Sequence, residues 1–413
     1  MTKQSKKSKV INLGCRLNFF ESEIINNIIS KNKKQVVINT CAVTNNAVQK
    51  SIYAVKKAIK ENPNYEIMVT GCASQIEKER FQNIDKVKRI IDNKFKTLPQ
   101  SYETEEKIIA ENFKFPSLEY HSSERTRATL QIQQGCDHRC TFCIIPFGRG
   151  DSISLPIGEI SKRMEKILKM GFSEIVLTGV DLTSYGEDLP GKPKLGNILK
   201  RLFTLHPNLK RLRLSSIDPA EIDDELFDLF CFEKRLMPHL HLSLQSGDNL
   251  ILKRMKRRHS RETVIEICKR LRSIRKDITF GADLIVGFPT EGKKEFLNSI
   301  DLLENCKFSN IHIFPFSPKK GTPAARMPQV EKSTINERAA YARKVFEKIL
   351  YKQMKDKIGN TKNFLFESEN LSHTDDFFKV KIVKKNSDTF LRSGSFVRAK
   401  ILGIDKDKFE VAI

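Results

Sequence analysis

Tryptophan is absent from the 413 residues, and no run of eighteen or more apolar residues occurs. A membrane-spanning helix needs about 20 such residues, so the sequence predicts none. The basic N-terminal residues 1–9 lack the apolar stretch of a secretory signal. Nine cysteines, an odd number, do not fit a disulfide framework and favour metal binding or catalysis in a reducing compartment. We therefore expect a cytoplasmic protein that does not associate with a membrane.

Acidic residues are few relative to basic ones. The chain has 73 Lys and Arg against 50 Asp and Glu, a formal net charge of +23. Such an excess favours a polyanionic partner, nucleic acid above all. The chain is also rich in Lys, Asn and Ile throughout, so part of the excess reflects general composition. The charge therefore indicates the class of partner but not where it binds.

The closest group of cysteines is Cys136, Cys140 and Cys143, a CxxxCxxC spacing. Four cysteines saturate an iron–sulfur cluster, so three would leave one iron open to another ligand. A closed zinc site needs four ligands, usually from two cysteine pairs, and no second pair lies nearby. His138 lies between two of the cysteines, where it is poorly placed as a fourth ligand. We therefore favour an iron–sulfur cluster, with structural zinc as the alternative.

A second trio, Cys15, Cys41 and Cys72, is spread over three repeats of an apolar run followed by a helix-compatible stretch. Alternating strands and helices predict a parallel sheet, in which ligands lie beyond the carboxyl ends of the strands. Each cysteine ends one run, so we expect the three to meet at one edge and hold a second cluster. The alternative is three buried structural thiols. Three further cysteines fall in apolar helical patterns and are predicted to be core residues: Cys231, Cys268 and Cys306.

The sequence predicts an α/β protein of three domains. The first, 8–115, carries the parallel sheet, and a polar connector covers about 92–127 with an acidic patch at 103–106. The second, 122–352, alternates helical patterns with predicted strands at 129–133, 174–179, 211–215, 239–245, 281–287 and 310–316, as in a partial (β/α)6 TIM-like barrel. A long helix at 335–357 follows. The third domain, 355–413, is predicted to be a small all-β, OB-like barrel with strands at 364–366, 378–383, 396–402 and 409–413.

These two cysteine trios, their order and the appended β domain resemble the radical S-adenosylmethionine (SAM) methylthiotransferases over essentially the whole chain. Family-like stretches are 14–23, 39–44, 71–73, 145–150 and 243–247. The stretches 178–186 and 213–219 are most similar to the bacterial branch that acts on threonylcarbamoyladenosine in tRNA. The C-terminal domain is similar to the TRAM domain of that family. Two positions depart from the family pattern, Phe147 in place of tyrosine and Asp151 in place of a basic residue.

The resemblance implies an enzyme with two 4Fe–4S clusters and SAM as cofactors. Cys136, Cys140 and Cys143 would hold the cluster that binds SAM and releases a 5′-deoxyadenosyl radical. That radical would take hydrogen from C2 of N6-threonylcarbamoyladenosine at tRNA position 37. Cys15, Cys41 and Cys72 would hold the auxiliary cluster that delivers a methylated sulfur to this carbon. The partners implied are tRNA, an electron donor and a sulfur source.

Weaker candidates lie at the ends of barrel strands. From the resemblance we expect four residues to contact SAM: Ser243, Gln245, Arg254 and Gly287. The run 253–261 carries six cations in nine residues, which predicts phosphate contacts unless it is only a solvated face. Its candidate tRNA-binding residues are Lys256, Arg257, Arg258 and Arg261.

Other functions remain open from the sequence. Within the family, the substrate could instead be isopentenyladenosine 37 of tRNA or an aspartate of a ribosomal protein. From another class, the chain could be a non-catalytic metal-containing RNA-binding protein. Iron content separates the two classes, and the modified nucleoside separates the branches.

Overall fold

The computed structural model describes residues 8–29, 34–103, 113–116, 126–384 and 390–413. The chain divides into two compact units. The sheet unit comprises the described residues up to 122 together with 134–153 and 317–322. The barrel unit comprises the described residues of 123–133, 154–316 and 323–413. The segment with the CxxxCxxC cysteines therefore packs with the N-terminal sheet, although it interrupts the barrel in sequence.

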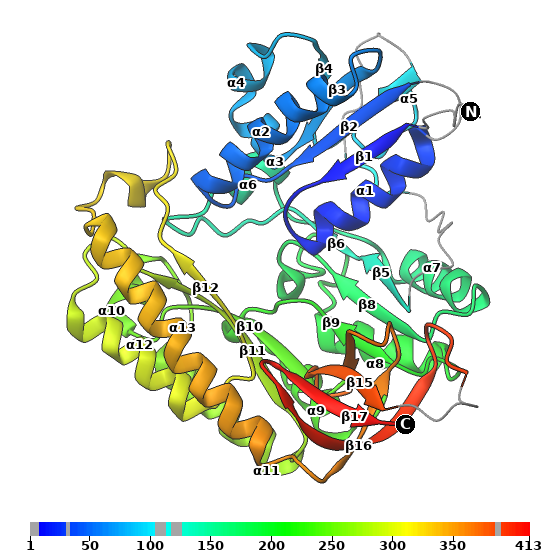
Figure 1. The fold of residues 1–413 in the computed structure, drawn as a ribbon, viewed down its shortest axis with the longest axis vertical. Coiled ribbons are helices and arrows are strands. Elements are labelled where there is room, and N and C mark those ends of the chain that lie inside the picture. Colours follow the sequence, from blue (N-terminus) through cyan, green and yellow to red (C-terminus); the bar gives the residue numbers. More distant parts are fainter. Residues whose placement is uncertain (1–7, 30–33, 104–112, 117–125, 385–389) are drawn as a thin grey trace. The chain divides into compact units, whose positions relative to one another are not determined.

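A four-stranded parallel sheet in the order β1-β2-β3-β4 forms the core of the sheet unit (Figure 1). Val37 and Met68 pack with helix α1 on one face, and Val36 and Val69 pack with α2 on the other. Because both faces are covered, the strands read as continuous apolar runs. The strands are β1 (Lys9–Asn12), β2 (Gln35–Thr40), β3 (Glu66–Gly71) and β4 (Val87–Ile90). The helices are α1 (Arg16–Ile29), α2 (Asn45–Glu61), α3 (Cys72–Ile76), α4 (Lys78–Gln82), α5 (Gln100–Glu103) and α6 (Ile145–Arg149).

The predicted connector is in part a packed segment. Lys96 and Tyr102 are buried, and the Tyr102 hydroxyl donates to the carbonyl of Lys96 at 2.6 Å. The connector prediction was therefore wrong for about 92–103, because these polar side chains find partners inside the unit. Most of the acidic patch lies outside the described residues. Strand β4, of four residues, was also missed.

Two three-stranded parallel sheets, β5-β8-β9 and β10-β11-β12, form the open barrel. Parallel bridges Leu212–Leu236 and Ile217–Leu242 connect them. The strands are β5 (Arg127–Gln131), β8 (Glu174–Thr178), β9 (Leu212–Leu214), β10 (His239–Gln245), β11 (Thr279–Val286) and β12 (Asn310–Pro315), with short β6 (Gln133–Gln134) and β7 (Ile153–Ser154) at the unit boundaries. All six predicted barrel strands are present, which confirms the α/β barrel.

Helices cover the outside of the open barrel, and the longest of them, α13, contacts β12 and β11 (Figure 1). They are α7 (Ile157–Lys169), α8 (Leu195–Leu205), α9 (Asp224–Phe232), α10 (Asn249–Arg254), α11 (Arg261–Ile274), α12 (Lys293–Cys306) and α13 (Lys332–Lys355), with 3-10 turns at Leu182–Ser184, Pro219–Glu221 and Pro323–Arg326. Cys268 and Cys306 are buried as predicted, whereas Cys231 is only half-buried. None of the described helices is long and apolar enough to cross a lipid bilayer.

The C-terminal strands close into a small barrel in the order β13-β14-β15-β17-β16. Phe364, Phe378 and Phe409 fill its interior. Closure leaves the sheet without an open edge, which confirms the predicted OB-like architecture. The strands are β13 (Thr361–Leu365), β14 (Ser372–Thr374), β15 (Lys379–Lys384), β16 (Phe396–Asp405) and β17 (Lys408–Ala412), of which only the three-residue β14 was not predicted.

The small barrel packs against the amino ends of the open-barrel strands. Glu174, at the start of β8, accepts from the Nε atoms of Arg127, Arg211 and Arg213 at 2.6, 2.8 and 2.9 Å. These arginines also reach the small barrel: Arg127 pairs with Glu367, and Arg211 pairs with Asp375. The amino end of the open barrel is therefore covered by protein.

Candidate functional site

The structure brings Cys15, Cys41 and Cys72 together at the carboxyl edge of the sheet. Cys41 directly follows β2 and Cys72 directly follows β3, while Cys15 follows β1 by three residues. Gly14 has φ +110°, and a Cβ there would lie 3.0 Å from the Cys41 sulfur. Gly71 has φ +101°, and a Cβ there would collide with the backbone of Thr40. These glycines allow the strand ends to approach one another closely, which only a residue without a side chain permits.

A buried charge cluster lies beside this trio. The carboxylate of Glu21 on α1 pairs with Lys96 at 2.6 Å and with Arg149 at 2.7 and 3.0 Å. All three side chains are almost fully buried. Burial alone would raise the pKa of Glu21, but Arg149 and Lys96 outweigh it and lower that pKa. The cluster has two cations and one anion, so a net positive charge is buried next to the cysteines.

Arg149 also connects the CxxxCxxC segment to the ends of the sheet strands. Its Nη2 donates to Oδ1 of Asn18 at 2.5 Å, and Asn18 Nδ2 donates to the carbonyls of Leu13 and Thr40 at 2.8 and 2.9 Å. Asn93 Nδ2 adds a second connection, since it donates to Gly148 O at 2.6 Å and lies 3.8 Å from the Cys72 sulfur. Hydrogen bonds therefore hold the segment that follows Cys143 beside Cys15, Cys41 and Cys72.

Cys136, Cys140 and Cys143 are all half-buried in one loop of the sheet unit. The Cys136 amide donates to Gly150 O at 3.1 Å, and the Cys143 amide donates to Cys140 O at 3.0 Å. Gly135, at φ +74°, allows the loop to pack against Asp151, because a Cβ at this position would lie only 1.8 Å from Asp151 O. All six cysteines of the two trios thus belong to a single compact unit.

The structure accounts for one of the two departures from the family pattern. Asp151 pairs with Arg139 of the same loop at 2.8 Å, and Arg139 Nη1 also donates to Cys136 O at 2.7 Å. A carboxylate at position 151 therefore orients the arginine that braces the loop. Phe147 is largely exposed, and nothing in the structure explains its replacement of tyrosine.

The donor set and its surroundings fit anionic iron–sulfur clusters. Burial raises the pKa of the Cys41 thiol, and the neighbouring Cys72 and Cys15 raise it further, so the thiolates need a bound metal or nearby cations. Lys319 supplies another cation near Cys41. Its side chain is 4% exposed, and its Nζ lies 3.9 Å from Glu77 with no hydrogen-bond partner among the described residues. Three buried cations therefore surround the trio.

Of the four predicted SAM contacts, Ser243, Gln245 and Gly287 lie at the carboxyl ends of β10 and β11, whereas Arg254 ends helix α10. Gln245 ends β10 in a left-handed conformation, φ +67°, which is unusual for a side chain of this type. Arg254 donates to Oγ1 of Thr290 at 2.7 Å, which connects α10 to the loop after β11. Ser243 O accepts from Arg257 at 3.0 Å. Gly287, at φ +73°, packs against Ile335, and its amide donates to Glu291 at 2.8 Å.

The cationic run is largely engaged inside the barrel unit. Arg257 pairs with Asp218 at 2.8 Å and is almost buried. Arg258 pairs with Asp218 at 3.0 Å and with Glu221 at 2.5 Å. Arg261 donates to Gly247 O at 3.0 Å. Lys253 and Lys256 are exposed, so they are the members of the run best placed to meet a phosphate.

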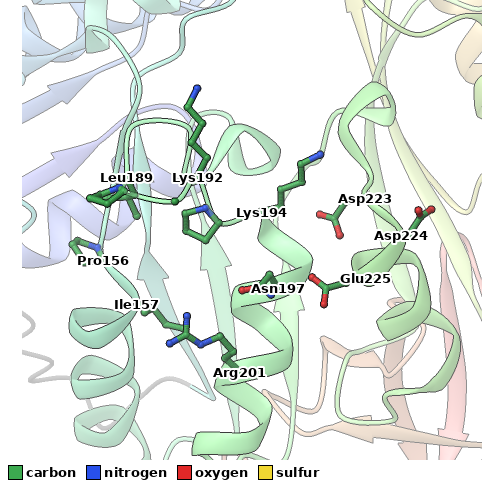
Figure 2. A pocket seen from close by; sticks show the side chains of 13 residues that line it. Pro156, Ile157, Leu189, Lys192, Lys194, Asn197, Arg201, Asp223, Asp224 and Glu225 are labelled. Carbon is green, nitrogen blue, oxygen red and sulfur yellow. The ribbon is translucent and has the colours of Figure 1, made fainter.

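Sequence reasoning missed several of these residues. Glu21 lies within the family-like stretch 14–23, which could have marked it as a site residue. Lys96 and Lys319 lie in segments with no motif. A separate hollow of about 900 Å³ lies beside α7, α8 and α9 and combines Lys192, Lys194 and Arg201 with three carboxylates (Figure 2). No predicted site residue lines it, so it is not the site described above.

Comparisons with known proteins agree with these features. Residues 130–303 match the radical SAM superfamily, and residues 7–92 match an uncharacterised protein family, UPF0004. The chain is 45% identical, over 97% of its length and 96% of the relative, to the threonylcarbamoyladenosine tRNA methylthiotransferase MtaB of Rickettsia prowazekii. It is 32% identical to the Bacillus subtilis protein of the same name, over 94% and 92% of the two chains. It is 31% identical, over 86% and 87%, to the tRNA-2-methylthio-N(6)-dimethylallyladenosine synthase of Ehrlichia canis.

Two solved structures share the fold. The radical SAM methyltransferase TsrM from Kitasatospora setae matches with a TM-score of 0.51 and 14% identity, over 75% of this chain and 69% of that one. The cobalamin-dependent SAM radical enzyme OxsB matches with a TM-score of 0.50 and 13% identity, over 83% and 56%. At these identities the likeness concerns the fold alone.

Proposed function

The chain belongs to the radical SAM tRNA methylthiotransferases, and on this premise we propose that it transfers a methylthio group to C2 of N6-threonylcarbamoyladenosine at tRNA position 37. The 45% identity to a relative named for that substrate supports this choice over isopentenyladenosine, for which the relative from Ehrlichia canis is 31% identical.

Its cofactors are SAM and 4Fe–4S clusters, which when bound supply a 5′-deoxyadenosyl radical and a sulfur-carrying iron. We assign Cys136, Cys140 and Cys143 to the SAM-binding cluster. We assign Cys15, Cys41 and Cys72 to the auxiliary cluster. The observation that supports this assignment is that both trios lie in one compact unit, in which Arg149 of the CxxxCxxC segment bonds to Glu21 and Asn18 of α1.

The residues around the trios have roles of their own in this proposal. Arg149, Lys96 and Lys319 offset the negative charge of the thiolates, which lowers the cost of burying them. Arg139 holds the carbonyl of Cys136 and so keeps the CxxxCxxC loop in one conformation. Ser243, Gln245 and Gly287, at the carboxyl ends of β10 and β11, would orient SAM together with Arg254 at the end of α10.

The remaining partners complete the proposal. The tRNA would contact exposed cations such as Lys253 and Lys256. An electron donor and a sulfur source are required for turnover. The place of action would be the cytoplasm, where tRNA is modified and thiols stay reduced.

The test is turnover of tRNA that carries threonylcarbamoyladenosine, with product nucleosides analysed by mass spectrometry. Anaerobically reconstituted protein should contain about eight irons per chain, as two 4Fe–4S clusters require, and should form the 2-methylthio product. A protein that holds zinc without iron and forms no product would instead be a non-catalytic binding module.

Two triple variants form a matched pair for the cluster assignment. The variant Cys136→Ala/Cys140→Ala/Cys143→Ala should retain about half the iron and release no 5′-deoxyadenosine from SAM. The variant Cys15→Ala/Cys41→Ala/Cys72→Ala should also retain half the iron and still cleave SAM, yet form no methylthio product. Wild-type SAM cleavage by the first variant, or methylthiolated product from the second, would contradict the assignment.

A further inference from the structure

Three polar side chains meet on one face of the β10-β11-β12 sheet: His241, Asp283 and His312. The Oδ1 atom of Asp283 lies 3.2 Å from Nε2 of His241 and 3.0 Å from Nδ1 of His312. The two imidazole rings are 5.3 Å apart between centroids. One carboxylate oxygen is thus shared by two histidines from the neighbouring strands.

The backbone is built to allow this arrangement. His312 is the direct partner of Asp283 in the parallel register of β11 and β12. His241 is the partner of Gly281, and a Cβ at Gly281 would lie 2.5 Å from Nδ1 of His241. The glycine therefore leaves room for the ring of His241 to lean across β11 toward Asp283. A larger residue at position 281 would displace it.

The face that carries these side chains is the open one. Leu242 and Leu284 alternate with them and are fully buried on the opposite face. Along β10 the same open face carries Ser243 and Gln245 toward the carboxyl end, where ligands enter such barrels. Toward the amino end, the ring of His239 stacks on Phe377 of the small barrel, 4.8 Å between centroids. The three side chains therefore lie nearer to the covered amino end of the open barrel than Ser243 and Gln245, which are expected to hold SAM.

The protonation pattern follows from the carboxylate. Burial would raise the pKa of Asp283, but the two imidazoles outweigh it and lower that pKa, so the group stays charged. A charged carboxylate can only accept hydrogen bonds. Nδ1 of His312 must then carry the proton that faces Asp283, which fixes the ring and turns Nε2 away from it. The His312 side chain is 57% exposed, so a ligand can reach Nε2.

We propose that His312, positioned by Asp283, recognises the carboxylate of the threonylcarbamoyl substituent on the adenosine. The inference rests on the proposed function and names the residue that selects its substrate. With both nitrogens protonated, the ring carries a charge that Asp283 balances, and the outward Nε2–H donates to the substrate carboxylate. An isopentenyl substituent has no polar atom to accept this hydrogen bond. RNA that carries it would therefore bind less tightly than RNA that carries the threonylcarbamoyl group.

The experiment compares anticodon stem-loop RNAs that carry threonylcarbamoyladenosine, isopentenyladenosine or unmodified adenosine at position 37. Fluorescence anisotropy with the reconstituted enzyme measures the affinity for each. Wild type should prefer the threonylcarbamoyl RNA over the other two by tenfold or more. The variant His312→Phe should lose that preference, with affinity for unmodified RNA and iron content unchanged. The matched control, His206→Phe, replaces a half-buried histidine at the C-terminal end of α8, away from the β10-β11-β12 sheet, and should keep it.

Asp283→Asn provides a second variant, which should reduce the same preference because the ring of His312 is no longer held. A His312→Phe protein that keeps the full preference would overturn the inference while leaving the proposed function intact. A wild-type enzyme that prefers isopentenyl RNA would overturn both. One equivalent of zinc or manganese in wild type that disappears in Asp283→Asn would also overturn the inference, because the three side chains would then be metal ligands.

Discussion

Arg149 and Arg139 lie ten residues apart in the same segment, but their surroundings differ. Arg149 is buried against Glu21 and Asn18, whereas Arg139 forms an exposed pair with Asp151. Removing one partner of a buried pair costs about 3–5 kcal/mol, and an exposed pair contributes about 0–1 kcal/mol. Arg149→Met should therefore lower the unfolding midpoint of the metal-free protein in urea far more than Arg139→Met, and reduce the iron retained after reconstitution. Equal effects of the two substitutions would show that the buried cluster is not the structural link.

The contact between the two barrels depends on Glu174, which is fully buried among three arginines. Burial would raise the pKa of Glu174, but the arginines lower it far below its ordinary 4.5. A carboxyl with a lowered pKa in the folded state stabilises the protein fully above its unfolded pKa, and this contribution is lost as pH falls below about 4.5. The melting temperature should therefore fall between pH 5 and pH 3, and the fall should be smaller in Glu174→Gln, which is destabilised already at pH 7. Glu165→Gln, at an exposed pair on α7, should match wild type at both pH values. An unchanged pH profile for Glu174→Gln would contradict this account.

The net charge of +23 predicts that tRNA binding weakens with salt, because each neutralised phosphate releases counterions. Lys253 and Lys256 are exposed after the carboxyl end of β10, and Lys276 and Lys307 are exposed before the amino ends of β11 and β12. Lys253→Glu/Lys256→Glu should reduce the slope of log affinity against log salt by about 0.7–0.9 for each phosphate that is no longer neutralised. Lys276→Glu/Lys307→Glu changes the net charge equally and should leave the slope near that of wild type. Equal slopes for the two variants would mean that only overall charge matters. Reversing Arg257 and Arg258 would not test this, since both pair with Asp218.

The sequence by itself determined the local elements and the chemistry of the cysteines. Strand β10 begins and ends at the predicted residues, and the other barrel strands lie within two residues of theirs, because apolar periodicity and strand-ending glycines are local signals. The cysteine at the end of each sheet strand was visible for the same reason. Parallel strands end at one edge, so three distant cysteines could be expected to meet there.

Only the tertiary structure decided which charged groups are buried and which partners they take. Lys96 and Lys319 resemble any other lysine in this lysine-rich chain, yet each is buried near the cysteines. Arg257 belongs to a cationic run in sequence, but Asp218, 39 residues away, holds it inside the barrel. His241, Asp283 and His312 come from three strands with no shared motif and meet through their register. Burial and pairing depend on contacts between residues distant in sequence, which no local pattern encodes.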